Sequence, residues 1–226
     1  MRNQTLLRRV RGRVGAFAAV AVLIPALTAC DSFFDVVNPN VIDASTVDPV
    51  ADGTVISRSA FQTFAAALGN YIVYAAWFSN EAWVGDTFPT RNEFGRRLID
   101  DRSNGDLNNT VFFPLARGIS QGEQVVELLG GVAGQELNVA RGAFTSGYGL
   151  TLQAAAFCEG TLPGAGNAPG PLMTPTQLLE AALVRFDKTI SAGGATTGAE
   201  ATSLVTAAKV GKGRALLQLG RRAEAA

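Results

Sequence analysis

The sequence predicts an all-α protein. Apolar residues recur at steps of three and four in five separate segments, the spacing that places them on one face of a helix. Gly, Pro and Asn gather between these segments, as is typical of turns and loops. Convincing runs that alternate between apolar and polar residues, the pattern of a half-buried strand, are not found in the sequence.

Residues 1–29 have the organisation of a lipoprotein signal peptide. Five arginines precede an apolar run of about 14 residues that ends at Leu27, which is shorter than the roughly 20 residues of a membrane-spanning helix. Leu27-Thr28-Ala29-Cys30 then matches a lipobox, in which the cysteine is lipidated and becomes the mature N-terminus. We therefore expect acylated Cys30 to anchor the chain to a membrane. The alternative is an ordinary cleaved signal in which Cys30 is incidental.

Residues 30–56 are expected to form the lipidated N-terminus and an extended tether, because they are rich in Asp, Asn, Pro and β-branched residues. Residues 57–226 are expected to form the helical domain, with a loop over residues 85–109 and another over residues 160–171. The apolar face predicted for the first helix consists of Phe61, Phe64, Ala65, Leu68, Ile72 and Ala75. The expected helices run from Ser57 or Ser59 to about Asn80, over about 110–129 and 136–157, from Pro175 after the N-cap Thr174 to Gly193, and over about 199–219.

The charge balance and the absence of histidine exclude several function classes. All 19 acidic residues follow Cys30 but only 14 of the 19 basic ones do, so the mature chain has a net charge near −5. Nucleic acids are bound mainly by clustered Lys and Arg, so we expect no nucleic-acid partner. A chain without histidine has no Ser-His-Asp triad, no imidazole zinc ligand and no histidine general base.

The remaining chemical motifs are incomplete, so we expect no enzyme activity, no cofactor and no metal site. Gly211-Lys212 lacks the first glycine and the Ser or Thr of a phosphate loop. Asp100–Gly105 resembles the start of a calcium loop, but Arg102 occupies a ligand position and Val111 replaces the required Glu, which favours a polar turn. Cys158 has no intrachain partner once Cys30 is acylated and is expected to be a buried small hydrophobe.

Two stretches near the C-terminus resemble tetratricopeptide repeats, which are stacked helix pairs of about 34 residues. "ALLQLGRRAEAA" resembles the end of one repeat helix, a tight turn at Gly220 and the start of the next helix. "LLEAALVRFDKTI" places Ala182 before Phe186, the small-then-aromatic order of a second repeat helix. Generic amphipathic helices are the alternative interpretation.

The order of motifs along the whole chain points to one family. A lipobox and an Asp/Asn-Pro tether precede an aromatic-rich helix ending in "FSNEAW", and then come "PLARGISQGEQVVELL", "ARGAFTSGYGLTLQAAAFCEG", "MTPTQLLEAALVRFDKTI" and "AAKVGKGRALLQLG". This order resembles the N-terminal part of the SusD/RagB family of outer-membrane nutrient-uptake lipoproteins. The family's chains are longer, and "GRRAEAA" has no helix-ending Gly or Pro, so we expect a C-terminal truncation.

The resemblance implies an all-α, tetratricopeptide-like protein that is lipid-anchored in the outer membrane at the cell surface. It implies capture of glycans or other nutrients without turnover, and delivery to a TonB-dependent channel of the SusC type. Asp31 after Cys30 would favour retention at the inner membrane in some bacteria. A repeat lipoprotein that scaffolds outer-membrane assembly is the main alternative, and a secreted hydrolase would need catalytic carboxylates that no motif locates.

The candidate ligand-binding residues are aromatic. Tyr71, Tyr74, Trp77 and Trp83 gather at the end of the first helix and in the loop beyond it. Sugars stack on such rings, which offer a large apolar face with a polar edge. Tyr74 and Trp77 are three residues apart and so lie on one side of the helix. We name Tyr74, Trp77 and Trp83 as candidate ligand contacts, with a place in the hydrophobic core as the alternative.

Overall fold

The computed structural model describes residues 46–164, 168 and 170–226. Cys30, the signal peptide and the tether as far as residue 45 lie outside the described residues. The chain divides into two units, Met1–Val47 and Asp48–Ala226, and the second contains the described helices. None of the helices in this described part is long and apolar enough to cross a membrane.

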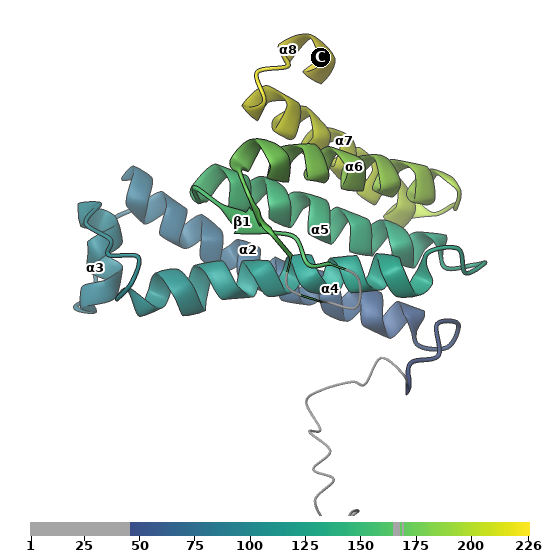
Figure 1. The fold of residues 1–226 in the computed structure, drawn as a ribbon, viewed down its shortest axis with the longest axis horizontal. Helices are drawn as coiled ribbons and strands as arrows, with labels where there is room; N and C mark the ends of the chain where they lie inside the picture. The colour runs from purple at the N-terminus through teal and green to yellow at the C-terminus, as the bar shows by residue number, and fades with distance from the viewer. Residues whose placement is uncertain (1–45, 165–167, 169) are drawn as a thin grey trace, which may run out of the picture. The chain divides into compact units, whose positions relative to one another are not determined.

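The described chain is mostly helical, as the sequence predicts (Figure 1). A two-stranded antiparallel pair, in which Gly160 pairs with Met173, has its first strand in the predicted loop over residues 160–171 and its second strand directly after that loop. The elements in order are α2 (Gly53–Ser79), α3 (Pro89–Arg96), the π-helix η3 (Leu107–Phe112), α4 (Phe113–Leu129), α5 (Glu136–Ala156), β1 (Gly160–Thr161), β2 (Leu172–Met173), α6 (Pro175–Gly194), α7 (Ala199–Gln218) and α8 (Arg222–Ala225).

Helix α5 is the centre of the fold. It packs against α2, α4, α6 and α7, and Figure 1 shows α4, α5 and α6 lying side by side. Most of its residues are apolar or small, and its polar side chains Asn138, Arg141 and Gln153 are buried with them. The largest core cluster contains Leu150 and Leu152 of α5, Leu115 of α4, and Phe186 of α6.

The glycines of α5 allow its close contact with α4. A Cβ atom at Gly142 would lie 2.6 Å from Val125 Cγ1, and one at Gly122 of α4 would lie 2.7 Å from the Gly142 carbonyl oxygen. Glycine normally weakens a helix interior by roughly 1 kcal/mol relative to alanine. Here close helix packing explains why glycine occupies these two positions.

Local signals place several helix ends where the sequence predicts them. Thr174 and Gln177 form a capping box at the start of α6, with Pro175 in the first turn. The Gln177 side chain accepts a hydrogen bond from the Thr174 amide at 2.8 Å. Asn80 ends α2 in the left-handed conformation, at φ 64°.

The start and the buried face of α2 correct the sequence prediction. The helix begins at Gly53, so residues 53–56 belong to it rather than to the tether. Ser57 is buried inside the helix and donates a 2.8 Å hydrogen bond to Asn138 Oδ1 of α5. The buried face of the helix differs from the predicted one. Of the residues predicted to be buried, only Phe64 is fully buried, and Phe61 and Ile72 are exposed. The helix is apolar nearly all round, so the periodicity alone did not identify the face that α4 and α5 cover.

Two further expectations are corrected and a third is confirmed. The predicted loop over residues 85–109 contains α3 and the first residues of η3. Cys158 is exposed rather than buried, because α5 ends at Ala156 and Phe157 adopts an extended conformation that leads the chain out of the core. The stretch Asp100–Gly105 does contain the expected polar turn, in which Asp100 Oδ1 accepts a 3.0 Å hydrogen bond from the Arg102 amide.

Candidate functional site

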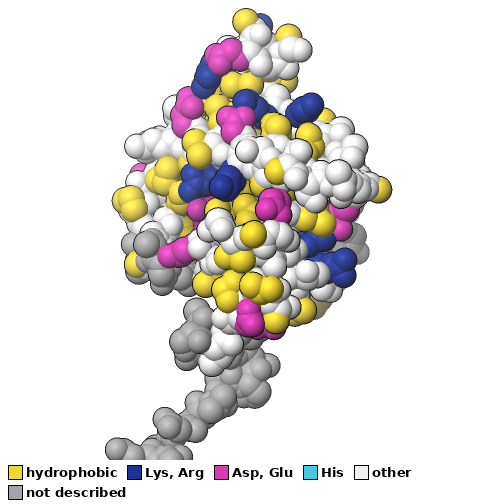
Figure 2. Space-filling model, turned by 90° about the vertical axis from the view of Figure 1, so that its right-hand side faces the viewer, with side chains coloured by type: hydrophobic (Ala, Val, Ile, Leu, Met, Phe, Trp, Pro, Cys, Tyr) yellow, Lys and Arg dark blue, Asp and Glu magenta, His cyan; other side chains and the backbone are white. Residues whose placement is uncertain are grey.

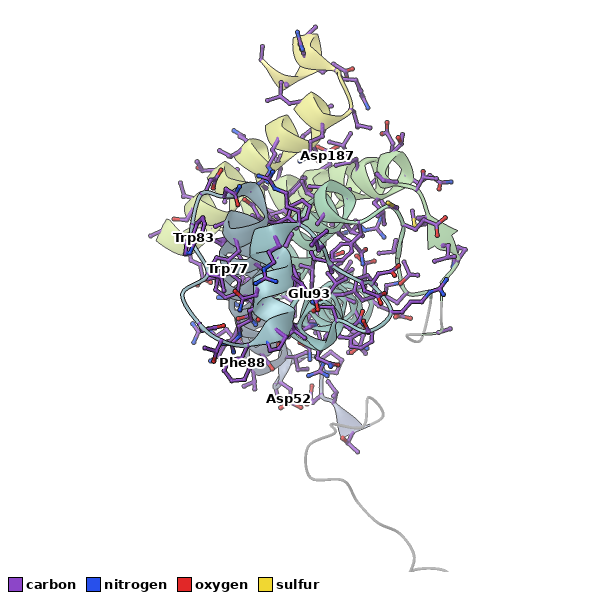
Figure 3. All side chains as sticks on the ribbon, turned by 90° about the vertical axis from the view of Figure 1, so that its left-hand side faces the viewer. Asp52, Trp77, Trp83, Phe88, Glu93 and Asp187 are labelled. Carbon is purple, nitrogen blue, oxygen red and sulfur yellow. The ribbon has the colours of Figure 1, made fainter. Side chains whose placement is uncertain are left out.

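The candidate ligand residues lie where α2 ends and α3 begins. Asn80 reverses the chain, the segment 81–88 follows, and Pro89 begins α3 with its fixed φ angle suited to a first helical turn. Figure 3 looks onto this end of the molecule and labels Trp77, Trp83, Phe88 and Glu93 around α3.

A buried asparagine holds α3 in place. Asn104 is 1% exposed, and its Nδ2 donates to the Thr90 carbonyl oxygen at 2.9 Å and to Glu93 Oε2 at 2.6 Å. Its Oδ1 accepts from the Leu107 amide at 2.8 Å, so one side chain joins α3 to the start of η3. Buried polar groups that have hydrogen-bond partners, as Asn104 has, fix the relative positions of the segments that they join.

Three further hydrogen bonds stabilise the same segments and connect them to α2. Asp106 accepts hydrogen bonds from the hydroxyls of Thr90 at 2.5 Å and Thr110 at 3.2 Å. Arg97, in the left-handed conformation after α3, donates from Nε to the Phe78 carbonyl oxygen at 2.9 Å. The end of α2, α3 and η3 therefore form one connected structure.

The aromatic candidates are divided between the interior and the surface. Tyr74 is 5% exposed, and its ring packs edge-on against Trp77 and Phe94, with centroid distances of 4.8 Å to each. Burial, together with the nearby Asp106 carboxylate, raises the pKa of Tyr74, so its phenol stays protonated at neutral pH. Trp83, by contrast, is 87% exposed. The structure thus brings Tyr74 and Trp77 together and leaves Trp83 at the surface.

Trp83 borders a polar groove of about 180 Å³. Arg96 on the same groove is exposed and forms no hydrogen bond or ion pair with the described part of the chain. Both side chains are therefore available to a ligand. The groove is lined by Asn80, Ala82, Trp83, Val84, Asn92, Gly95 and Arg96.

Two carboxylates beside the groove, those of Asp86 and Glu93, have partners. Asp86 forms a 2.8 Å ion pair with Arg91, which lowers the pKa of that carboxyl group. Glu93 accepts the hydrogen bond from Asn104. Among the described residues, no group of three His, Cys, Asp or Glu side chains is placed to hold a metal ion.

A second hollow, here called the apolar cavity, has a volume of about 250 Å³. Tyr74 lines it, so the buried candidate belongs to this cavity and the exposed Trp83 to the polar groove. Its walls come from α2, α3, the segment before η3, η3 itself, and the end of α5. The lining residues are Tyr71, Tyr74, Ala75, Phe78, Phe94, Ile99, Leu107, Val111, Ala155, Ala156 and Phe157.

The sequence analysis places the candidate ligand residues at the end of α2 and in the segment after it, but it does not predict the apolar cavity or the position of Asn92 and Arg96 on the polar groove. The apolar cavity joins segments far apart in the chain, and no local pattern reports that contact. Comparisons of the chain with protein families, with curated proteins and with solved structures give no match.

Proposed function

We propose that the protein is a lipid-anchored nutrient-binding protein of the outer-membrane surface, which captures oligosaccharides and delivers them to a TonB-dependent, SusC-like channel. The observation that carries the ligand part is the polar groove, which is lined by exposed Trp83 and by Arg96, a side chain without an ion-pair partner among the described residues. The anchor rests on the lipobox at Cys30, and the channel rests on the order of motifs that resembles SusD/RagB proteins.

The side chains of the polar groove suit a sugar. An indole ring offers a broad face for the C–H face of a pyranose, and Trp83 has most of its surface free. A guanidinium group presents several donors in a fixed plane, which suits sugar hydroxyls or a sugar carboxylate at Arg96. The amides of Asn80 and Asn92 lie on the same groove.

The proposed activity is capture without chemical change. Hydrolysis of a glycosidic bond commonly needs one carboxylic acid and one free carboxylate on either side of the bond. Beside the polar groove, Asp86 is paired with Arg91, and Glu93 accepts a hydrogen bond from Asn104. These contacts favour a structural role for both carboxylates.

A glycan panel tests the ligand part. We expect Trp83→Ala to weaken binding of any glycan found about tenfold, because loss of a stacking contact costs roughly 1.4 kcal/mol. Arg96→Ala should weaken it as well. Leu217→Ala is the matched control, since it shortens another exposed apolar side chain on α7. Unchanged affinity in both groove variants would exclude this groove as the glycan site, and released product would indicate a hydrolase.

Purification from native membranes tests the partner. We expect the tagged protein to bring down a large TonB-dependent β-barrel channel. The scaffold alternative is favoured by the exposed apolar side chains Ile72 and Val73 on α2 and Val210 on α7, which would suit a protein partner. Repeated recovery of barrel-assembly proteins without a channel would support the scaffold.

A further inference from the structure

The apolar cavity is a second binding site of different chemistry. Five of its lining side chains are aromatic: Tyr71, Tyr74, Phe78, Phe94 and Phe157. The described residues that line it include no charged side chain, and the tyrosines supply the only polar side-chain groups. Such a lining favours an uncharged, largely apolar occupant, because an unpaired charge placed there would lose its hydration.

The walls of the apolar cavity include an unusual element. Leu107 and Val111 belong to η3, a π-helix of six residues. π-Helices are rare in proteins and are found frequently at functional sites. Here the element ends at Phe112, and the regular helix α4 begins directly after it at Phe113. The π-helix is an observation independent of the chemistry of the lining, and it also indicates a functional site at the apolar cavity.

The cavity is held open by polar contacts behind its walls. Asn70 Nδ2 donates to the Thr110 carbonyl oxygen at 3.3 Å, which connects α2 to η3. Asn104 and Asp106 hold α3 against η3, as described above. Since these contacts do not involve the space inside the cavity, the site is formed before a ligand arrives, as is usual for small-molecule sites.

We propose that the apolar cavity binds an uncharged aromatic system of about two fused rings, either as a small molecule or as a group of a larger ligand. A dry cavity of about 150 Å³ admits benzene, and the 250 Å³ available here leaves space for a second ring. Aromatic walls favour an aromatic occupant, because edge-to-face and offset ring contacts add to the hydrophobic gain.

The mouth of the apolar cavity offers positions where substitutions can fill it. Ala75 of α2 and Ala156 of α5 line the cavity and are exposed, so a larger side chain there can enter the cavity without displacing the core. Ala65, also exposed on α2, is outside the lining and provides a matched control. The proposal does not depend on glycan binding, which involves Trp83 on the separate polar groove.

The test uses the full chain with Cys30→Ser, which prevents attachment of lipid, and 5-fluoroindole as the probe observed by fluorine NMR. We expect saturable binding at one site. Ala75→Phe and Ala156→Phe should each weaken it about tenfold or more, equivalent to roughly 1.4 kcal/mol. Ala65→Phe and Trp83→Ala should leave the affinity within about twofold, a difference of roughly 0.4 kcal/mol.

Circular dichroism melts of each variant establish that it is folded. Absence of saturable binding by the parent protein would overturn the proposal. So would unchanged affinity in both filled variants, or loss of binding in Trp83→Ala, which would assign the probe to the polar groove. Loss of glycan binding in Trp83→Ala, together with retained 5-fluoroindole binding, would support both sites. If one of the two ligands does not bind at all, the result for the other ligand still applies to its own site.

Discussion

At the residue scale, Arg141 shows how the fold accommodates a buried charge. The residue is 3% exposed, and its guanidinium donates to both oxygens of Glu200, from Nε at 2.5 Å and from Nη2 at 2.7 Å. Nη1 donates to Ser57 Oγ at 3.2 Å and to Asn138. A buried charge is tolerated when it is paired and fully hydrogen-bonded. These contacts connect α2, α5 and α7.

Removal of the Glu200 charge should therefore destabilise the protein. We expect Glu200→Gln to lower the free energy of unfolding at neutral pH by about 1–2 kcal/mol, less than for a fully buried pair because Glu200 is half exposed. Urea denaturation measures this. Glu81→Gln, an exposed control, should change stability by less than about 0.5 kcal/mol.

The same pair predicts a pH dependence. The Arg141 hydrogen bond lowers the pKa of Glu200 below its ordinary value of 4.5. A lowered carboxyl pKa in the folded state stabilises the protein above the unfolded pKa, and this contribution is lost as the pH falls through the folded pKa. The stability difference between the parent protein and Glu200→Gln should therefore shrink below about pH 4. A difference that stays constant down to pH 3 would contradict this assignment.

At the element scale, the contact between α4 and α5 depends on glycine. Gly122 and Gly142 face each other, and Ser146 lies so close that a Cβ on Gly122 would be 2.9 Å from its amide nitrogen. We expect Gly122→Ala to reduce the free energy of unfolding by about 1–3 kcal/mol through overpacking, despite the better helix propensity of alanine. Thermal melts of the two proteins would measure the loss.

Gly69→Ala is the matched control for this prediction. Gly69 lies inside α2, and a Cβ there would meet no atom within 4 Å. Alanine should stabilise this helix by about 0.5–1 kcal/mol, since it restricts the unfolded chain and favours the helix. If both variants shifted the melting temperature in the same direction, close packing would not explain the glycine at residue 122.

The elements also show what a sequence can predict. Thr174 and Pro175 act on their own helix end, so the sequence predicts the start of α6 to the residue. The helix α3 was missed because it has only one buried side chain, Phe94, and depends on Asn104 from a later turn. The site follows the same rule: its aromatic composition was visible in the sequence, but the burial of Tyr74 and the exposure of Trp83 arise from tertiary packing.

At the scale of the whole molecule, charge gives the folded unit little attraction to an anionic membrane. Residues 48–226 carry 16 acidic and 14 basic side chains. On the face drawn in Figure 2, Lys and Arg side chains are scattered among Asp and Glu. Juxtamembrane basic clusters are what draw proteins to anionic lipid. If the protein is held at a membrane, the proposed lipid on Cys30 is the group expected to hold it.

This reasoning predicts how membrane attachment responds to one substitution and to salt. One acyl chain gives only marginal, reversible attachment, whereas two or more anchor a protein stably, since each buried CH₂ contributes about 0.8 kcal/mol. In cells fed an alkyne-labelled fatty acid, we expect the parent protein to become labelled and the Cys30→Ala variant to remain unlabelled. We also expect only the parent protein to float with membranes in a density gradient. Washing with about 1 M salt should not release it, because salt screens charge but does not weaken burial of acyl chains. Equal labelling of the two proteins would exclude Cys30 as the acylated residue, and release by salt would show that charge rather than lipid holds the protein.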